Sequence, residues 1–160
     1  MAAIVLEHGG GENEAIAALF HDAVEDQGGP ATRAEIHRRF GDQVATLVDG
    51  CTDAETVPKP PWRGRKDAYV SHIGGASASV HLISAADKLH NARSLLADYR
   101  QVGEALWDRF RGGRDGTLWY YRALVDAFRA AGPTPLVEEL ERTVGELERL
   151  ADAGSLTVEP

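Results

Sequence analysis

The stretch Ala18-Leu-Phe-His-Asp-Ala-Val-Glu-Asp-Gln27 carries four ionisable side chains within six residues. They are His21, Asp22, Glu25 and Asp26, and they directly follow an apolar run that ends at Phe20. The apolar spacing predicts a helix, and a helix that brings carboxylates and an imidazole against its own apolar face incurs a desolvation cost. Because a partner cation or a metal ion normally offsets that cost, the stretch is typical of half of a metal site.

The other half is predicted in the block Ala85-Ala-Asp-Lys-Leu-His-Asn-Ala-Arg-Ser94. Asp87 interrupts an otherwise apolar helical pattern there. Asp87, Asn91 and Ser94 fall on one line of that helix, at positions i, i+4 and i+7. The line runs beside an apolar stripe, which is the arrangement expected where a helix borders a buried pocket.

Together the two halves predict a site for one divalent metal ion. His21, Asp22 and Asp87 would supply one nitrogen and two carboxylate ligands, a set that suits Mn²⁺, Fe²⁺, Mg²⁺ or Zn²⁺. Glu25 and Asp26 lie one turn beyond, where they could orient and deprotonate a water molecule. The chemistry implied is metal-assisted hydrolysis of a phosphoester or phosphoanhydride.

Nearly all periodic segments of the chain have the helical period, so we expect an all-α fold, a compact bundle without strands. One domain is expected over residues 1–160, with a metal-site core over about 1–100 and C-terminal helices over about 103–160. In the helix that starts near Asn13, the expected core stripe is Ile16, Leu19, Phe20 and Ala23. The helices are predicted over residues 2–7, 13 to 24 or 26, 32–40, 44–48, 62–73, 77–100, 117–131 and 135–153, with a loop over 52–61.

Composition limits the possible partners. Seventeen basic and 25 acidic residues give a net charge of −8, which disfavours binding to nucleic acid or to an anionic membrane. The chain has no apolar run of the roughly 20 residues needed to span a bilayer, and its start lacks a secretory signal. With a single cysteine, Cys51, a reducing compartment fits, and we expect a cytoplasmic protein.

These residues resemble a known family. His21-Asp22 with Asp87 downstream is the signature of HD-domain metal-dependent phosphohydrolases. A longer match is similar to the hydrolase domain of RelA/SpoT-type alarmone enzymes, in the same order and spacing from Ala2 to about Leu96. The blocks that carry it are His21–Asp26, Ile36–Gly41, Val44–Thr52 and Ala86–Asn91.

The resemblance implies a small stand-alone hydrolase with a compact HD-domain bundle. Such enzymes remove the 3′-diphosphate from guanosine 3′,5′-bis(diphosphate), usually with Mn²⁺. By the same resemblance, the metal ligands are His21, Asp22 and Asp87, and the water-activating pair is Glu25 and Asp26. Asn91 matches a nucleotide-contacting residue, and Ser94 stands where many members have threonine.

A dense basic patch offers a further candidate for substrate binding. Lys59, Arg63, Arg65 and Lys66 could capture phosphate at a pocket mouth, with Lys66 as the chosen residue, or could simply be a solvated helix start.

One feature of the family has no match in this chain. The family has a further metal-ligand histidine upstream of His21, and we expect its position to lie before Met1, with Ala2–His8 as the tail of that helix. Two alternatives stay open: an HD enzyme for another phosphorylated metabolite, such as a deoxynucleotide, and a member that binds nucleotide without turnover. An exposed apolar N-terminal segment also allows a homo-oligomer.

Overall fold

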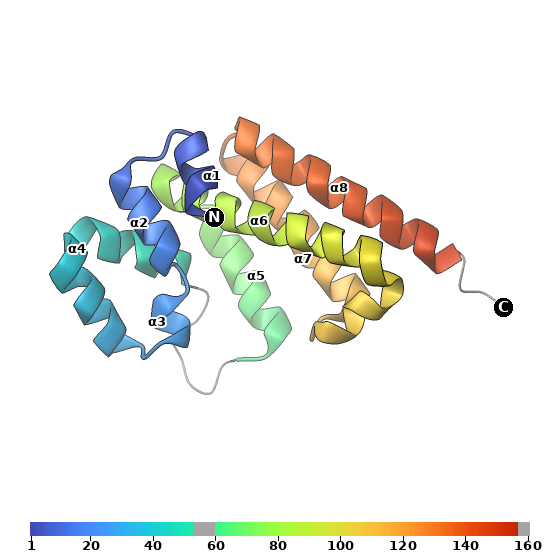
Figure 1. The fold of residues 1–160 in the computed structure, drawn as a ribbon, viewed down its shortest axis with the longest axis horizontal. Helices are drawn as coiled ribbons and strands as arrows, with labels where there is room; N and C mark the ends of the chain where they lie inside the picture. Colours follow the sequence, from blue (N-terminus) through green and yellow to red (C-terminus); the bar gives the residue numbers. More distant parts are fainter. Residues whose placement is uncertain (53–59, 157–160) are drawn as a thin grey trace. The chain divides into compact units, whose positions relative to one another are not determined.

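The computed structural model describes residues 1–52 and 60–156, with side chains up to Gly154. Every regular element in those ranges is a helix, which confirms the predicted all-α fold (Figure 1). The elements are α1 (Ala2–Glu7), α2 (Glu12–Phe20), α3 (Ala23–Asp26), α4 (Pro30–Cys51), α5 (Trp62–Ile73), α6 (Ala78–Val102), the 3₁₀ helix η1 (Gly103–Arg109), α7 (Gly113–Ala131) and α8 (Pro135–Leu156). Most of the predicted loop over 52–61, including Lys59, lies outside the described residues.

The chain divides into two compact units, Met1–Asp87 and the part from Lys88 onward. The division falls inside α6, so the predicted boundary near residue 100 does not coincide with it. The single domain over residues 1–160 stays a prediction.

The second helix differs from its prediction in two ways. Its N-cap is Gly11 rather than Asn13, and the helix ends at Phe20 instead of continuing to residue 24 or 26. The expected core stripe is also wrong, because Leu19 is 70% exposed while Ala17 and Ala18 are buried. Small alanines let α2 lie close against α1 and α4, which both pack on it.

Helix α4 bends at Gly41. The sequence predicted two helices separated there, over 32–40 and 44–48, and the structure joins them into Pro30–Cys51 with one non-helical residue. Gly41 has φ 85° and ψ 176°, a region that is essentially restricted to glycine. The start also differs, because Pro30 takes the first helical position and Thr32 Oγ1 donates to the Gln27 carbonyl instead of capping.

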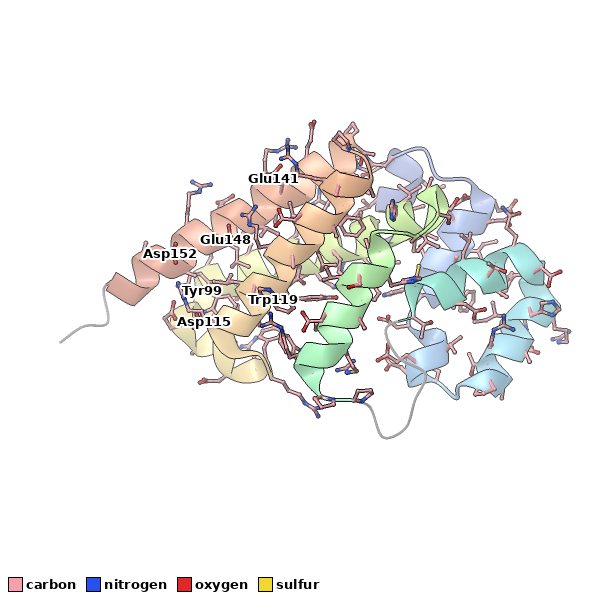
Figure 2. The ribbon with its side chains drawn as sticks, turned by 180° about the vertical axis from the view of Figure 1, so that it is seen from behind. Tyr99, Asp115, Trp119, Glu141, Glu148 and Asp152 are labelled. Carbon is pink, nitrogen blue, oxygen red and sulfur yellow. The ribbon has the colours of Figure 1, made fainter. Side chains whose placement is uncertain are left out.

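The second unit is built around an apolar seam between α7 and α8, which lie side by side (Figure 1). Leu124, Phe128, Leu140, Val144 and Leu147 are fully buried or nearly so in this unit. The acidic residues of α8 pair with arginines on both neighbouring helices, and Figure 2 labels three of them along α8, Glu141, Glu148 and Asp152. The pairs are Arg93–Glu139 and Arg100–Glu146 with α6, and Arg114–Asp152, Arg122–Glu148 and Arg129–Glu141 with α7.

Candidate active site and metal centre

The His21-Asp22 pair occupies a break in the chain between two helices. His21 is the C-cap of α2 and Asp22 is the N-cap of α3, so the predicted continuous helix through these residues is wrong. The break brings neighbouring side chains together, with His21 Nε2 at 2.9 Å from Asp22 Oδ2. The other ring nitrogen, Nδ1, lies 3.1 Å from the Ala18 carbonyl oxygen, which directs Nε2 toward the carboxylates.

Asp22 does not use its carboxylate as its position suggests. An aspartate at an N-cap ordinarily accepts a hydrogen bond from an N–H group in the first turn of its helix. Among the described residues at the start of α3, that side-chain cap bond is missing, and the carboxylate faces His21. A local rule broken in this way is typical of a functional site.

Asp87 reaches the same imidazole from α6. Its residue is 7% exposed and lies among the buried residues Ala85, Ala86 and Leu89. Asp87 Oδ1 is 3.3 Å from His21 Nε2. A carboxylate so placed needs a compensating charge, and His21 provides one in this structure.

The charge of His21 reflects these two neighbours. Burial, the largest single influence, lowers the pKa of the His21 imidazole. Hydrogen bonds and charge attraction from Asp22 and Asp87 together outweigh it and raise that pKa to about 10. The imidazole is therefore protonated at neutral pH, and a cationic group sits between the two carboxylates.

The three side chains are of donor types that a divalent metal ion takes, one imidazole and two carboxylates. Neighbouring ligand atoms in an octahedron with bonds of about 2.1 Å lie about 3 Å apart. The 2.9 Å and 3.3 Å separations around His21 Nε2 are close to that value. Within residues 1–52 and 60–156, no three His, Cys, Asp or Glu side chains already form a ready metal-binding group. An ion would have to displace the proton on His21 Nε2 and draw the carboxylates toward itself.

The predicted water-activating pair lies on α3. Asp26 is exposed and Glu25 is half-buried. The Asp26 N–H donates to the Asp22 carbonyl at 2.9 Å, so the pair begins within one turn of Asp22. Their role stays a prediction.

The three predicted substrate-binding residues are distributed over two helices and both units. Lys66 is half-buried on α5, in the first unit. Asn91 and Ser94 are exposed on the part of α6 that belongs to the second unit, where Ser94 Oγ donates to the His90 carbonyl at 3.1 Å. Contact of these residues with a nucleotide stays a prediction.

Two ion pairs were not predicted from the sequence. Arg33 binds Asp49 across the bend of α4, and His37 Nε2 lies 2.5 Å from Asp42 Oδ1. The first pair joins residues 16 positions apart, and no helical spacing signals such a pair. The second spans the Gly41 bend, which changes the register that a straight helix would have.

Comparison with known proteins gives the family. Residues 1–118 match the family described as HD domain. The chain belongs to the HD domain family. HD domains generally depend on a divalent metal ion, which agrees with the donor set of His21, Asp22 and Asp87.

Named relatives share moderate identity with this chain. Guanosine-3′,5′-bis(diphosphate) 3′-pyrophosphohydrolase MESH1 from Xenopus tropicalis is 38% identical over 94 residues, covering 57% of this chain and 50% of the relative. The human protein of that name gives the same figures. The bifunctional (p)ppGpp synthase/hydrolase SpoT of Escherichia coli is 35% identical over 86 residues, covering 50% of this chain and 12% of SpoT. The chain thus spans about half the length of the MESH1 relatives that it matches.

A solved structure shares the fold over most of the chain. The crystal structure of lmo0812 from Listeria monocytogenes EGD-e has a TM-score of 0.78 and 30% sequence identity to this chain. The likeness covers 89% of this chain and 92% of lmo0812.

Proposed function

We propose that this chain hydrolyses guanosine 3′,5′-bis(diphosphate) at its 3′-diphosphate, releasing pyrophosphate and leaving guanosine 5′-diphosphate. The observation that carries the proposal is the meeting of His21, Asp22 and Asp87 at one imidazole nitrogen, in an HD domain. Relatives at 33–40% identity bear the name of this activity.

His21, Asp22 and Asp87 are proposed to hold the metal ion, with Mn²⁺ as the expected metal. When bound, such an ion lowers the pKa of water and neutralises charge on phosphoryl oxygens. The protein holds the imidazole in place through Ala18, so that Nε2 is directed toward the ion. Burial of Asp87 excludes water from one side of the site.

Glu25 and Asp26 are proposed to orient the attacking water and to accept its proton. The water oxygen bonds to the phosphorus attached to the 3′ oxygen, the phosphorus–oxygen bond to the ribose breaks, and the 3′ oxygen gains a proton. Asn91, Ser94 and Lys66 are proposed to bind the nucleotide. A nucleotide substrate and a single buried cysteine, Cys51, fit a cytoplasmic location.

The decisive experiment measures pyrophosphate release from guanosine 3′,5′-bis(diphosphate) with Mn²⁺, for the wild type and for Asp87→Asn. The matched control is Asp98→Asn, which also removes a carboxylate charge from α6, but from a half-exposed side chain that pairs with Arg109. We expect Mn²⁺-dependent turnover in the wild type and the control, and a loss of at least about a hundredfold in Asp87→Asn.

Other outcomes separate the alternatives. Release of orthophosphate from deoxynucleotides, with no release of pyrophosphate from guanosine 3′,5′-bis(diphosphate), would show that the chain is an HD phosphohydrolase with another substrate. Nucleotide binding with no product under any divalent metal would show a binding protein without turnover.

A further inference from the structure

Helix α3, which carries Glu25 and Asp26, lies between two joints. The first joint is the break at His21 and Asp22. The second is the Gly28–Gly29 turn, where both residues have positive φ angles of 118° and 56°. Of its four residues Val24 alone is buried, so the segments to which α3 is attached also contribute to its orientation.

The attachment is to the first segment of α4, Pro30–Phe40, which we call the arm. The Gly29 N–H donates to the Val24 carbonyl at 3.0 Å, and Thr32 Oγ1 donates to the Gln27 carbonyl at 2.5 Å. Helices α3 and α4 also pack together, as Figure 1 shows. A movement of the arm therefore moves α3 with it.

Apolar packing holds the arm at few points, one of which is the Phe40 ring, whose centroid lies 5.2 Å from that of Phe20. Within Pro30–Phe40, all of which the structure describes, Ile36 alone is buried. The second segment of α4 is anchored in the core of the first unit by Val44, Ala45, Leu47, Val48 and Cys51. Gly41 separates the two segments, so the angle at Gly41 decides where the arm lies.

Two ion pairs cross the Gly41 bend, His37 with Asp42 beside it and Arg33 with Asp49 farther from it, and the second pair uses both carboxylate oxygens. Arg33 Nε donates to Asp49 Oδ1 at 2.8 Å and to Oδ2 at 2.9 Å, and Arg33 Nη2 also contacts Oδ2. A planar guanidinium held by both oxygens of a carboxylate allows little rotation. Asp49 belongs to the anchored segment, and the side chains of Arg33 and Asp49 are 45% and 28% exposed.

We propose that Arg33 and Asp49 are positioning residues for Glu25 and Asp26. The pair fixes the bend of α4, the bend places the arm, and the arm orients α3 against the His21-Asp22 break. The inference rests on the proposed function for the role of the two carboxylates, whereas the mechanical linkage rests on the geometry alone.

The test compares Asp49→Asn with Glu35→Gln. Glu35 is also a carboxylate of α4 and also pairs with arginines, Arg38 and Arg39, but these lie within the arm and do not cross Gly41. We expect Asp49→Asn to lower kcat by up to about a hundredfold with KM changed by less than about twofold, because substrate binding is intact while the carboxylates are misplaced. Glu35→Gln should leave both constants near wild type.

A second readout does not depend on activity. Hydrogen exchange of the Asp26 and Gln27 amides, which donate to the Asp22 and Ala23 carbonyls at 2.9 Å, reports the order of α3. Both amides should exchange faster in Asp49→Asn than in Glu35→Gln. The charge-exchanged double variant Arg33→Asp with Asp49→Arg should recover part of both kcat and protection.

Each outcome decides the proposal. The proposal is overturned if Asp49→Asn has the same kcat as the wild type, or if amide hydrogen exchange in α3 is unchanged in that variant. This holds even if the wild type hydrolyses guanosine 3′,5′-bis(diphosphate). Should the wild type release no pyrophosphate, the proposed function fails, and the exchange comparison alone then supports or overturns the linkage.

Discussion

The His21 imidazole supplies positive charge to Asp22 and Asp87, the same kind of compensation that a divalent ion at these side chains would bring. The Ala18 carbonyl fixes one ring nitrogen, and the two carboxylates face the other. This explains why a buried carboxylate is tolerated in the middle of α6. It also means that proton and metal compete for the same nitrogen.

The pH dependence of stability follows from the raised pKa of His21. The pKa of His21 is about 10 in the folded protein and near the ordinary imidazole value of 6.5 in the unfolded chain, so the folded state binds the proton more tightly. The stabilisation is complete below the unfolded pKa and is lost as pH rises toward 10. Urea unfolding in the presence of a chelator measures the free energy of unfolding of the wild type and of His21→Gln. The difference, wild type minus variant, should fall as the pH rises from 6.5 to 10. A difference that stays constant over that interval would show that His21 is not held by the two carboxylates.

At the scale of elements, α4 shows how one residue divides a helix into segments with different roles. The core-facing segment is buried, and the arm is mostly exposed. Gly41 allows the division because its backbone conformation is restricted to glycine, not because the space is tight. A Cβ added at Gly41 would meet no heavy atom of the described residues within 4 Å.

Gly41→Ala should therefore be destabilising through backbone strain alone. We expect the free energy of unfolding to fall by about 1–3 kcal/mol, measured by urea unfolding. The matched control is Gly64→Ala in the helix interior of α5, where a Cβ also meets nothing within 4 Å of it among described atoms. There the change should be neutral or stabilising by up to about 1 kcal/mol. Equal effects at both positions would contradict the strain argument.

The acidic helix α8 is a packing element with paired charges on two sides. Its glutamates face arginines of α6 on one side and of α7 on the other, while its apolar residues fill the seam. Such pairs in solvent contribute little individually, but their spacing favours one register of the three helices.

The less exposed pair should couple more strongly. The side chains of Arg122 and Glu148 are 36% and 27% exposed, against 55% and 39% for Arg100 and Glu146. Double-mutant cycles to alanine should give about 0.5–1 kcal/mol for the first pair and less than about 0.5 kcal/mol for the second. The reverse order would show that burial does not decide the strength of these pairs.

At the scale of the whole molecule, the net charge bears on the proposed substrate, a polyanionic nucleotide. The net charge of −8 repels such a substrate, so the proposed binding would require local cations and the proposed metal ion. No helix within the described ranges is long and apolar enough to cross a membrane.

Metal binding should stabilise the folded chain as a whole. At Mn²⁺ about 100-fold above its Kd, the gain is about 2.7 kcal/mol, which raises Tm by roughly 5–10 °C for a chain of this size. Differential scanning calorimetry with and without chelator measures this shift. Asp87→Asn should abolish this shift and Asp98→Asn should retain it. An equal shift in Asp87→Asn would place the ion elsewhere.

Much of the fold follows from the sequence because helical periodicity is a local property. The predicted helix over 62–73 coincides with α5, and the predicted gap between the helices over 32–40 and 44–48 contains the Gly41 bend. Burial is less predictable, since it depends on the partner: Leu19 has the residue type of a core position, yet it is 70% exposed, because the neighbours of α2 pack against its alanines.

The amino-acid order by itself determined that the chain is helical and identified His21, Asp22 and Asp87 as one set, since residue type and spacing carry that chemistry. Only the tertiary structure decided that the chain breaks after Phe20, which turns adjacent side chains toward one point. It alone also brought Asp87 to His21 and Arg33 to Asp49. These contacts depend on packing between helices and on the angle at a glycine, which no local pattern encodes.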